Sequence, residues 1–318
     1  MEDLRSSIAY VIKKFGANKM IWPLITEFIG LIPMFIVVGM VLWRKRQLDK
    51  DSRRDPLTTE LLRLPGESLQ CRLEAMMDKH IEKLVLLVSL GLMTGLLIAV
   101  RRIGEHPMPW GVVDTVLFLG AMVAAVVIGL KLTQAMPERR RYHQALRAEQ
   151  ATAQEVAAAL IGDNRLIHDV QAGEFNIDHV AITPTGIFAI ETKSRLKPPV
   201  GNGTPKVKYD GRILDFGSWQ ETKPIDQATR QAHWLEEYLK RSTGDTHSVT
   251  PVLALPGWFV ESTVRLTDRM VRVINPKNSQ WLLLPQRQSV QLDSATIQRV
   301  AFQIEKLAQA PEEQGNSR

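Results

Sequence analysis

Three long apolar runs dominate the first 131 residues of the chain. They cover residues 28–43, 84–100 and 115–130, and none contains a charged residue. About 17–25 residues cross a bilayer, so each run reaches that length once its flanks are included. Buried core helices are the alternative, but such helices usually carry a polar stripe and these runs do not. The sequence therefore predicts three transmembrane helices, at about 21–43, 84–100 and 111–131.

The basic residues around these runs predict how the chain is oriented. Residues 44–83 contain ten Lys and Arg, and residues 131–150 contain five. The opposite side has four before the first span and two between residues 101 and 110. Because cytoplasmic loops carry the excess of Lys and Arg, this difference predicts a multi-pass inner-membrane protein. Its C-terminal half would lie in the cytoplasm and its first 20 residues outside.

Small residues recur at four-residue spacing in the second and third runs, as in the pair Gly91 and Gly95 and the pair Ala125 and Gly129. This spacing favours close packing of these two helices, or oligomerisation through them. Two acidic residues, Glu27 and Asp114, lie near predicted span ends, where solvation at the interface is expected. A channel or transporter is the weakest interpretation, because no feature of the sequence other than these two acidic residues supports it.

The charge distribution separates the two halves of the chain. Residues 1–150 contain 21 basic and 15 acidic residues, whereas residues 151–318 contain 19 of each. A neutral second half does not resemble a basic protein that coats DNA through bulk charge. The one cysteine, Cys71, excludes an intramolecular disulfide and a cysteine-rich zinc site.

The second half reads as a soluble α/β domain over residues 151–309. A basic helical linker, residues 132–150, precedes it, and a flexible tail, residues 310–318, follows it. Alternating and β-branched runs bounded by turn residues predict strands at 166–170, 177–182, 187–192, 249–255 and 271–274. Two further strands, at 206–209 and 212–216, are expected to form a hairpin around the turn Asp210-Gly211. Helical spacing of apolar residues predicts helices at about 224–240 and from 294 onward.

Two carboxylates and a lysine come together on the hairpin formed by residues 177–192. If the chain turns symmetrically at Pro184 and Thr185, Val180 faces Ala189 and Asp178 faces Glu191. Directly opposed residues share one face, and so do Glu191 and Lys193 on one strand. Opposed like charges are destabilising unless a cation offsets them, and Mg²⁺ takes carboxylate oxygens. The alternative is a surface ion cluster neutralised by Lys193, worth about 0–1 kcal/mol.

At these residues the sequence resembles a known family. The runs Asn-Ile-Asp-His-Val (176–180), Thr-Pro-Thr-Gly-Ile-Phe (183–188) and Ile-Glu-Thr-Lys-Ser (190–194) are similar to the nuclease-related domain, NERD, and to the wider PD-(D/E)xK nuclease superfamily. Pro224 to Gln227 resembles the family's Pro-x-x-Gln entry into a helix. The resemblance covers roughly residues 151–285. It implies a restriction-endonuclease-like fold with a mixed central sheet.

The resemblance also implies roles for individual residues. Asp178 and Glu191 would hold Mg²⁺ or Mn²⁺, and Lys193 would orient the attacking water or stabilise developing charge. Gln227 would support the site or contact the substrate. Glu155 matches the acidic residue of the family's helical Gly-Glu motif, although Gln154 precedes it here in place of Gly. Glu155 would otherwise be a solvated helix carboxylate, and Gln227 an exposed polar residue.

These features predict a membrane-anchored, metal-dependent nuclease whose partners are nucleic acid, in the first place DNA, and the lipid bilayer. Basic and aromatic residues near the site could receive a nucleic-acid backbone, or merely solvate their loop and hairpin. They are Arg195, Lys197, Lys206, Lys208 and Tyr209. The rival hypothesis is a catalytically inactive nucleic-acid-binding or scaffold module that is tethered to the membrane.

Overall fold

The computed structural model describes residues 61–102, 109–160, 162–197, 205–267, 270–284 and 291–309, with eight positions between 36 and 47. The chain divides into two compact units. One comprises residues 1–58 and 77–136, and the other, called here the α/β unit, comprises residues 59–76 and 137–318. The predicted span at 21–43 lies mostly outside the described residues, so three spans are not confirmed.

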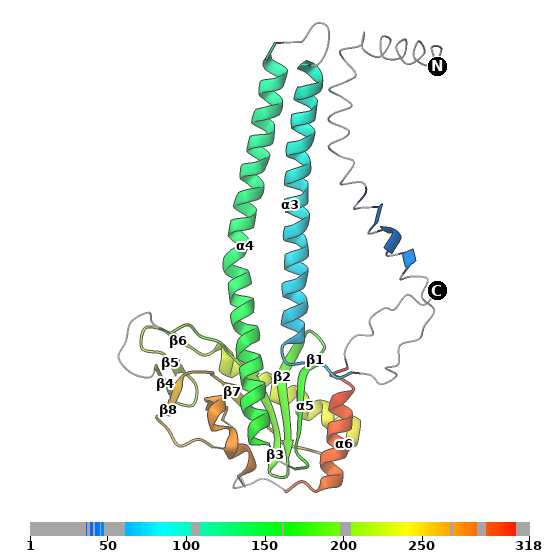
Figure 1. Ribbon diagram of the computed structural model, residues 1–318. Coiled ribbons are helices and arrows are strands. Elements are labelled where there is room, and N and C mark those ends of the chain that lie inside the picture. Colours follow the sequence, from blue (N-terminus) through cyan, green and yellow to red (C-terminus); the bar gives the residue numbers. More distant parts are fainter. Residues whose placement is uncertain are drawn as a thin grey trace. The chain divides into compact units, whose positions relative to one another are not determined.

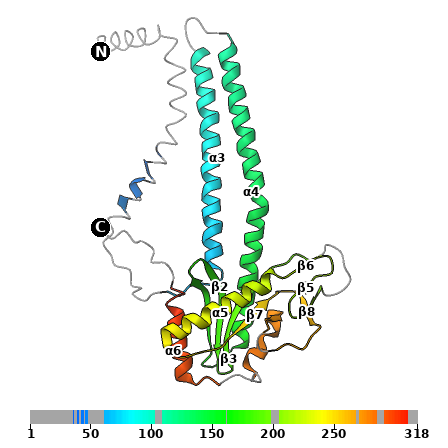
Figure 2. The same ribbon diagram turned by 180° about the vertical axis from the view of Figure 1, so that it is seen from behind.

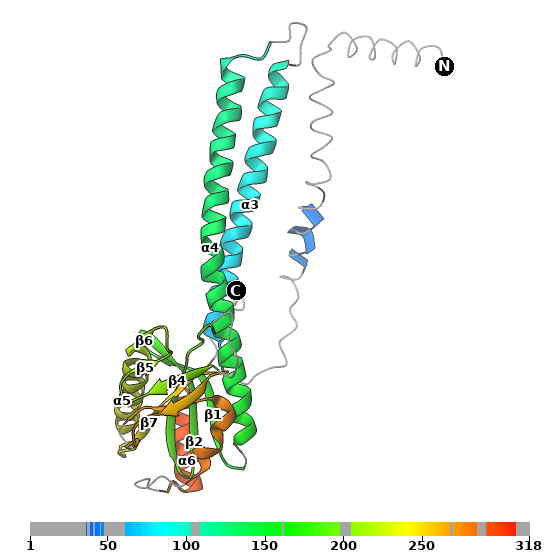
Figure 3. The ribbon, with the colours of Figure 1, turned by 90° about the vertical axis from the view of Figure 1, so that its left-hand side faces the viewer.

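Two long helices carry the other two apolar runs. They are α3 (Glu67–Arg102) and α4 (Val112–Ala159), and both are long and apolar enough to cross a membrane, judged by length and composition alone. Their segments at 77–102 and 112–136, called here the helical hairpin, run side by side (Figures 1 and 3). Apolar side chains point outward along it, and Val88 and Val123 are 62% and 63% exposed. The described N-terminal region is therefore helical, with two candidate spans.

Two expectations about the helical hairpin are wrong. A Cβ added at Gly91, Gly95 or Gly129 would have no neighbour within 4 Å, so these small residues do not bring α3 and α4 into close contact. Asp114 is not solvated at an interface, because it is 1% exposed. Its carboxylate pairs with Arg101 at 3.0 Å and accepts the Gly111 N–H at 3.0 Å, which fixes the start of α4.

A five-stranded mixed sheet forms the centre of the α/β unit, in the order β1-β2-β3-β7-β9. The first three strands are antiparallel, whereas β3, β7 and β9 are parallel. Their bounds are β1 Arg165–Ala172, β2 Phe175–Thr183, β3 Gly186–Thr192, β7 Val249–Ala254 and β9 Arg272–Ile274. The five strands predicted for this sheet are present, and the α/β class with a mixed sheet is confirmed.

Helices cover both faces of this sheet, so β2 and β3 are buried almost throughout. On one face lie α5 (Lys223–Thr243) and α6 (Ser294–Glu305), which contact the core around Val180 and Ala189 (Figure 2). The other face is covered by the C-terminal part of α4 and by the 3₁₀ helix η1 (Pro276–Leu283). The hairpin β2–β3 therefore lies buried between two helical layers.

A second, four-stranded sheet has the order β6-β5-β4-β8 and packs its own small core around Tyr209 and Trp258. Its strands are β4 Lys206–Tyr209, β5 Leu214–Asp215, β6 Gln220–Glu221 and β8 Phe259–Ser262. The turn between β4 and β5 forms because the Asp210 carboxylate accepts the N–H groups of Arg212 and Ile213. This sheet leads the chain from β3 to α5 and so sets where that helix begins.

The helix ends follow ordinary capping chemistry. Pro224 lies in the first turn of α5, and Gly244 closes the helix with φ at +80°, a conformation that glycine adopts without a Cβ penalty. Asp293 caps α6 by accepting the Thr296 N–H at 2.8 Å. The linker and the helix expected after it form one continuous helix with the third apolar run. In α4 the boundary between the two units falls at Pro137, which lacks the N–H that a helix interior needs.

Candidate active site

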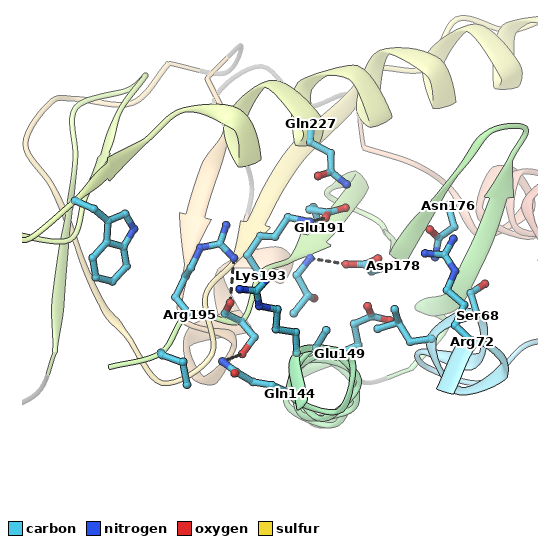
Figure 4. Close-up of a pocket in the computed structure, with 17 residues that line it drawn as sticks. Ser68, Arg72, Gln144, Glu149, Asn176, Asp178, Glu191, Lys193, Arg195 and Gln227 are labelled. Atoms are coloured by element: carbon cyan, nitrogen blue, oxygen red, sulfur yellow. Dashed lines mark hydrogen bonds and ion pairs between the residues drawn. The ribbon is translucent and has the colours of Figure 1, made fainter. Parts of the chain in front are cut away.

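The β2–β3 hairpin has the register that its turn predicts. Thr183 pairs with Gly186, Ile182 with Ile187 and Val180 with Ala189, and the ladder ends at the pair His179 and Ile190. Asp178, the next residue of β2, instead accepts the Thr192 backbone N–H with its carboxylate, at 2.7 Å. A side chain thus replaces the ladder bond at this point, and the Asp178 carboxylate is fixed at the end of the hairpin beside Glu191 (Figure 4).

Glu191 is held by two partners. One carboxylate oxygen pairs with the ammonium of Lys193, the residue that directly follows β3. The other oxygen accepts the side-chain N–H of Gln231 at 2.5 Å. The Lys193 backbone N–H in turn donates to the Ala254 carbonyl at 2.9 Å, so the end of β3 is tied to β7. The predicted convergence of Asp178, Glu191 and Lys193 is therefore present.

Burial distinguishes this cluster from a surface ion cluster. Asp178 and Glu191 are 6% and 2% exposed, whereas the Lys193 side chain is 26% exposed. Burial, followed by the charges of Glu191 and Glu149, raises the pKa of Asp178 well above its usual range. Carboxylates that are this crowded need a proton or a cation to compensate for their charge.

The helix carboxylate at the site is Glu149 and not Glu155. Glu149 is 6% exposed and lines the cavity, whereas Glu155 is not among the described residues that line it. Burial, then the charges of Glu191 and Asp169, raises the pKa of Glu149 to about 8. One of its carboxylate oxygens has no hydrogen-bond partner within the described ranges, so it is free to accept one. The two residues lie on one helix, and only the packing of α4 against the sheet selects between them.

Two glutamines of α5 face the site. The predicted Gln227 lines the cavity near Glu191 (Figure 4). Gln231, one turn later, was not singled out from the sequence, although its four-residue spacing from Gln227 places it on the same helix face. It is 1% exposed and donates to Glu191 and to the Asn176 carbonyl. Gln231 therefore fixes the orientation of Glu191, and Gln227 remains available to a ligand.

These side chains surround an open cavity of about 600 Å³ (Figure 4). All of the residues that line it belong to the α/β unit. Four of them are cationic: Arg72, Arg141, Lys193 and Arg195. Acidic side chains lie at the centre of the cavity, and cationic side chains lie around them.

Two of the four basic residues proposed for nucleic-acid contact, Arg195 and Lys206, pair with acidic side chains. Arg195 lines the cavity but binds Glu221 through two hydrogen bonds of 2.7 Å. Lys206 pairs with Glu261 on the neighbouring strand. Tyr209 is fully buried and donates to the Gly211 carbonyl, so it is a core residue. Of the residues proposed on the hairpin β4–β5, Tyr209 therefore belongs to the core, whereas Lys206 and Lys208 lie on its exposed face.

The donor set at the site fits a hard divalent cation. In the described part of the chain, no group of three or more His, Cys, Asp or Glu side chains is arranged to hold a metal ion. Mg²⁺, however, usually takes one or two protein carboxylates and completes its shell with water and substrate phosphate. Asp178 and Glu191 supply such a pair, and both are oxygen donors in a crowded, buried site.

The residues of this site lie within one segment that resembles a known family. No curated protein and no solved structure matches the chain. Asp178, Glu191, Lys193, Gln227 and Glu149 nevertheless all fall inside a single matched region. That region, residues 144–256, matches the family model NERD, the nuclease-related domain.

Proposed function

We propose that this protein is a membrane-anchored, metal-dependent nuclease that hydrolyses phosphodiester bonds at Asp178, Glu191 and Lys193. The observation that carries the proposal is the pair of buried carboxylates with a lysine on one hairpin, facing an open cavity. The match of residues 144–256 to a nuclease-related family supports the same chemistry.

In this proposal the two carboxylates hold Mg²⁺ or Mn²⁺ and the neighbouring groups keep them in place. The bound ion would polarise the phosphate and lower the pKa of a water molecule. The Thr192 N–H and Gln231 orient Asp178 and Glu191 respectively, so neither carboxylate has to reorganise on binding. The Lys193 ammonium would stabilise the negative charge that develops on the phosphate.

The two remaining polar groups have supporting roles. Gln227 lies near the start of α5, just after its first turn, and would donate a hydrogen bond to the substrate. Glu149, whose pKa is raised to about 8, would hold a proton near neutral pH and so limit the negative charge of the metal-free site. Glu155 has no role in this proposal.

The decisive experiment uses the full chain in detergent with supercoiled plasmid and labelled single strands. Cleavage is expected with Mg²⁺ or Mn²⁺ and not with chelator. Asp178→Asn should abolish it, and Lys193→Ala should reduce kcat by about 100-fold or more. The matched control is Asp163→Asn, because Asp163 is exposed and does not line the cavity. Equal cleavage by the Asp178 and Asp163 variants would refute the proposed site.

The rival function, a tethered nucleic-acid-binding module, makes the opposite prediction. It expects metal-independent binding without cleavage, and binding that survives Asp178→Ala. The buried cluster favours catalysis, because a binding surface gains little from placing carboxylates where a phosphate must approach. The same cleavage assay tests whether DNA is the substrate, whether single or double strands are cut, and what cleavage pattern results.

We also propose that α3, α4 and the first apolar run anchor the protein in the inner membrane, with the α/β unit in the cytoplasm. The outward-facing apolar side chains of the helical hairpin and the excess of Lys and Arg in residues 44–83 and 131–150 support this topology. Alkaline extraction should leave the chain in the membrane pellet. A reporter fused after Arg318 should be active only in the cytoplasm; a periplasmic signal would reverse the topology.

A further inference from the structure

A segment that is distant in sequence from residues 144–256 forms part of the cavity wall. Residues 61–76, called here the docked segment, precede the helical hairpin in sequence but belong to the α/β unit. The Arg63 backbone N–H donates to the Ala308 carbonyl at 2.8 Å, and Leu62 forms a bridge with Gln309. Three residues of the segment line the cavity: Ser68, Leu69 and Arg72.

A buried aspartate fixes this segment beside the site. Asp169 is fully buried and pairs with the Arg63 guanidinium at 2.8 Å. It also accepts the Ser68 backbone N–H at 3.0 Å and the Ser68 hydroxyl at 2.7 Å. In the β1–β2 register, the pairs on either side of Asp169 place it opposite Asp178. The first turn of α3 is therefore anchored one strand away from the proposed metal-holding pair.

A glycine brings the docked segment against α4 as well. Gly66 has φ at +75°, and a Cβ added there would lie 2.5 Å from the Leu146 side chain. The same Cβ would lie 3.3 Å from a carboxylate oxygen of Glu149. The backbone of the segment thus packs directly onto the helix that carries the acid of the site.

The anchoring directs Arg72 toward the cavity. Arg72 follows Ser68 by four residues, so both side chains lie on one face of α3. In Figure 4 the side chain of Arg72 extends toward Asn176, along the edge where Asp178 lies. Arg141 reaches the cavity from α4, on the same helix face as Ala145 and Glu149, which also line it.

The charges of Arg72 and Arg141 are not paired with any described acidic side chain. Of the four cationic residues described in the cavity lining, Lys193 pairs with Glu191 and Arg195 with Glu221. Neither Arg72 nor Arg141 has an ion pair or hydrogen bond to any described residue, although buried carboxylates line the same cavity. A polyanion that approaches these carboxylates needs compensating cations, and arginine binds phosphate through its planar donors.

We infer that Arg72 and Arg141 bind the backbone phosphates of the nucleic-acid strand on either side of the one that meets Asp178 and Glu191. The inference rests on the proposed function and names a part of the substrate site that the matched region lacks. Both arginines lie outside residues 144–256. The substrate site is therefore completed by the ends of α3 and α4 that belong to the α/β unit.

The binding test uses the full chain in detergent, with Asp178→Asn to stop cleavage and a fluorescein-labelled DNA 20-mer as the probe. Binding is followed by anisotropy in Mg²⁺ over a range of salt. Arg72→Gln and Arg141→Gln should each weaken binding about tenfold and lower the salt slope by about 0.7–0.9 per lost phosphate contact. Arg147→Gln is the matched control, because Arg147 is exposed on α4 and does not line the cavity.

Two further experiments distinguish failure of the inference from failure of the proposed function. In the chain with native Asp178, Arg72→Gln should raise KM about tenfold and leave kcat within about twofold, and Arg72→Lys should restore most of the binding. Cleavage with unchanged KM and salt slope in both variants would overturn the inference while the nuclease stands. Arginine-dependent binding without any cleavage would keep the inference and refute the nuclease. Absence of both binding and cleavage would overturn both.

Discussion

The helical hairpin and the α/β unit use the same kinds of side chain in opposite ways. Valine is 62% exposed at position 88 and 63% exposed at position 123, but fully buried at positions 180 and 252. In water, burial of such side chains is the main stabilising contribution to folding. The α/β unit therefore has a core of its own, whereas the helical hairpin leaves its apolar side chains exposed. The comparison indicates that burial of apolar side chains within the chain stabilises the α/β unit but contributes little to the helical hairpin.

The sharpest test of this difference places the same charge in both regions. Val180→Asp would bury an unpaired carboxylate and should destabilise the α/β unit by about 4 kcal/mol or more, which is enough to unfold it. Val123→Asp should leave the α/β unit folded but cost about 2.5–3.5 kcal/mol of membrane insertion. Limited proteolysis measures the first effect, and membrane insertion of the α4 segment alone measures the second, because α3 and the first apolar run would retain the full chain. Unchanged insertion of the α4 segment with Val123→Asp would contradict α4 as a span.

A second test asks how firmly the docked segment belongs to the α/β unit. Arg63→Ala removes the cation from the fully buried Asp169 and should lower the free energy of unfolding by about 3–5 kcal/mol. Arg299→Ala is the control, because Arg299 and Asp245 form a pair that is 54% exposed on both sides. It should cost at most about 1 kcal/mol. Equal effects in urea unfolding would mean that the segment is dispensable.

A third, smaller effect is expected at Gly66. Gly66→Ala combines a positive φ with a contact against Leu146 that is too short for a Cβ, so it should cost about 1–3 kcal/mol. Gly173→Ala is the matched control, with φ at +76° and nothing within 4 Å of the new Cβ. Gly173→Ala should lower the free energy of unfolding by about 1 kcal/mol, the contribution of the strained backbone alone. Thermal unfolding compares the two, and Leu146→Ala should partly rescue the Gly66 variant.

The smallest effect concerns acid and is confined to the α/β unit. Burial lowers the pKa of His168, whose ring nitrogen lies 3.0 Å from that of the fully buried His179. The unfolded chain therefore takes up a proton near pH 6.5 that the folded chain does not. The contribution of His168 to stability should then fall as pH drops below about 6.5, by up to about 1.4 kcal/mol per pH unit, whereas the raised pKa values of Asp178 and Glu149 act in the opposite direction. The His168 contribution is therefore measured as the difference between the native chain and His168→Gln in urea titrations across pH, and identical pH dependences of the two proteins would contradict it.

Local patterns predicted the centre of the fold and of the site. The two-residue turn at Pro184 and Thr185 set the β2–β3 register, and with it the meeting of Asp178 and Glu191. The apolar face of α5 followed from helical spacing, and its buried residues include Ile225, Ala228 and Leu235. Both features depend on neighbours only a few residues apart, which a sequence pattern records directly.

Contacts between distant parts of the chain could not be predicted in this way. Arg63 and Gln309 are 246 residues apart, and Ser68 and Asp169 are 101 apart. Nothing in the local sequence of 61–76 signals a partner in β1. The choice of Glu149 over Glu155 likewise depends on which turn of α4 meets the edge of the sheet.

The docked segment makes the α/β unit discontinuous along the chain, and this constrains the order of biosynthesis. Residues 61–76 leave the ribosome before the helical hairpin, while their partners at Asp169 and Ala308 emerge after it. The helical hairpin is therefore complete before the unit that contains the candidate site can close. Because Arg63 donates to the carbonyl of Gln309, the last described residue, the contacts that anchor the docked segment are complete only after about 309 residues have been synthesised.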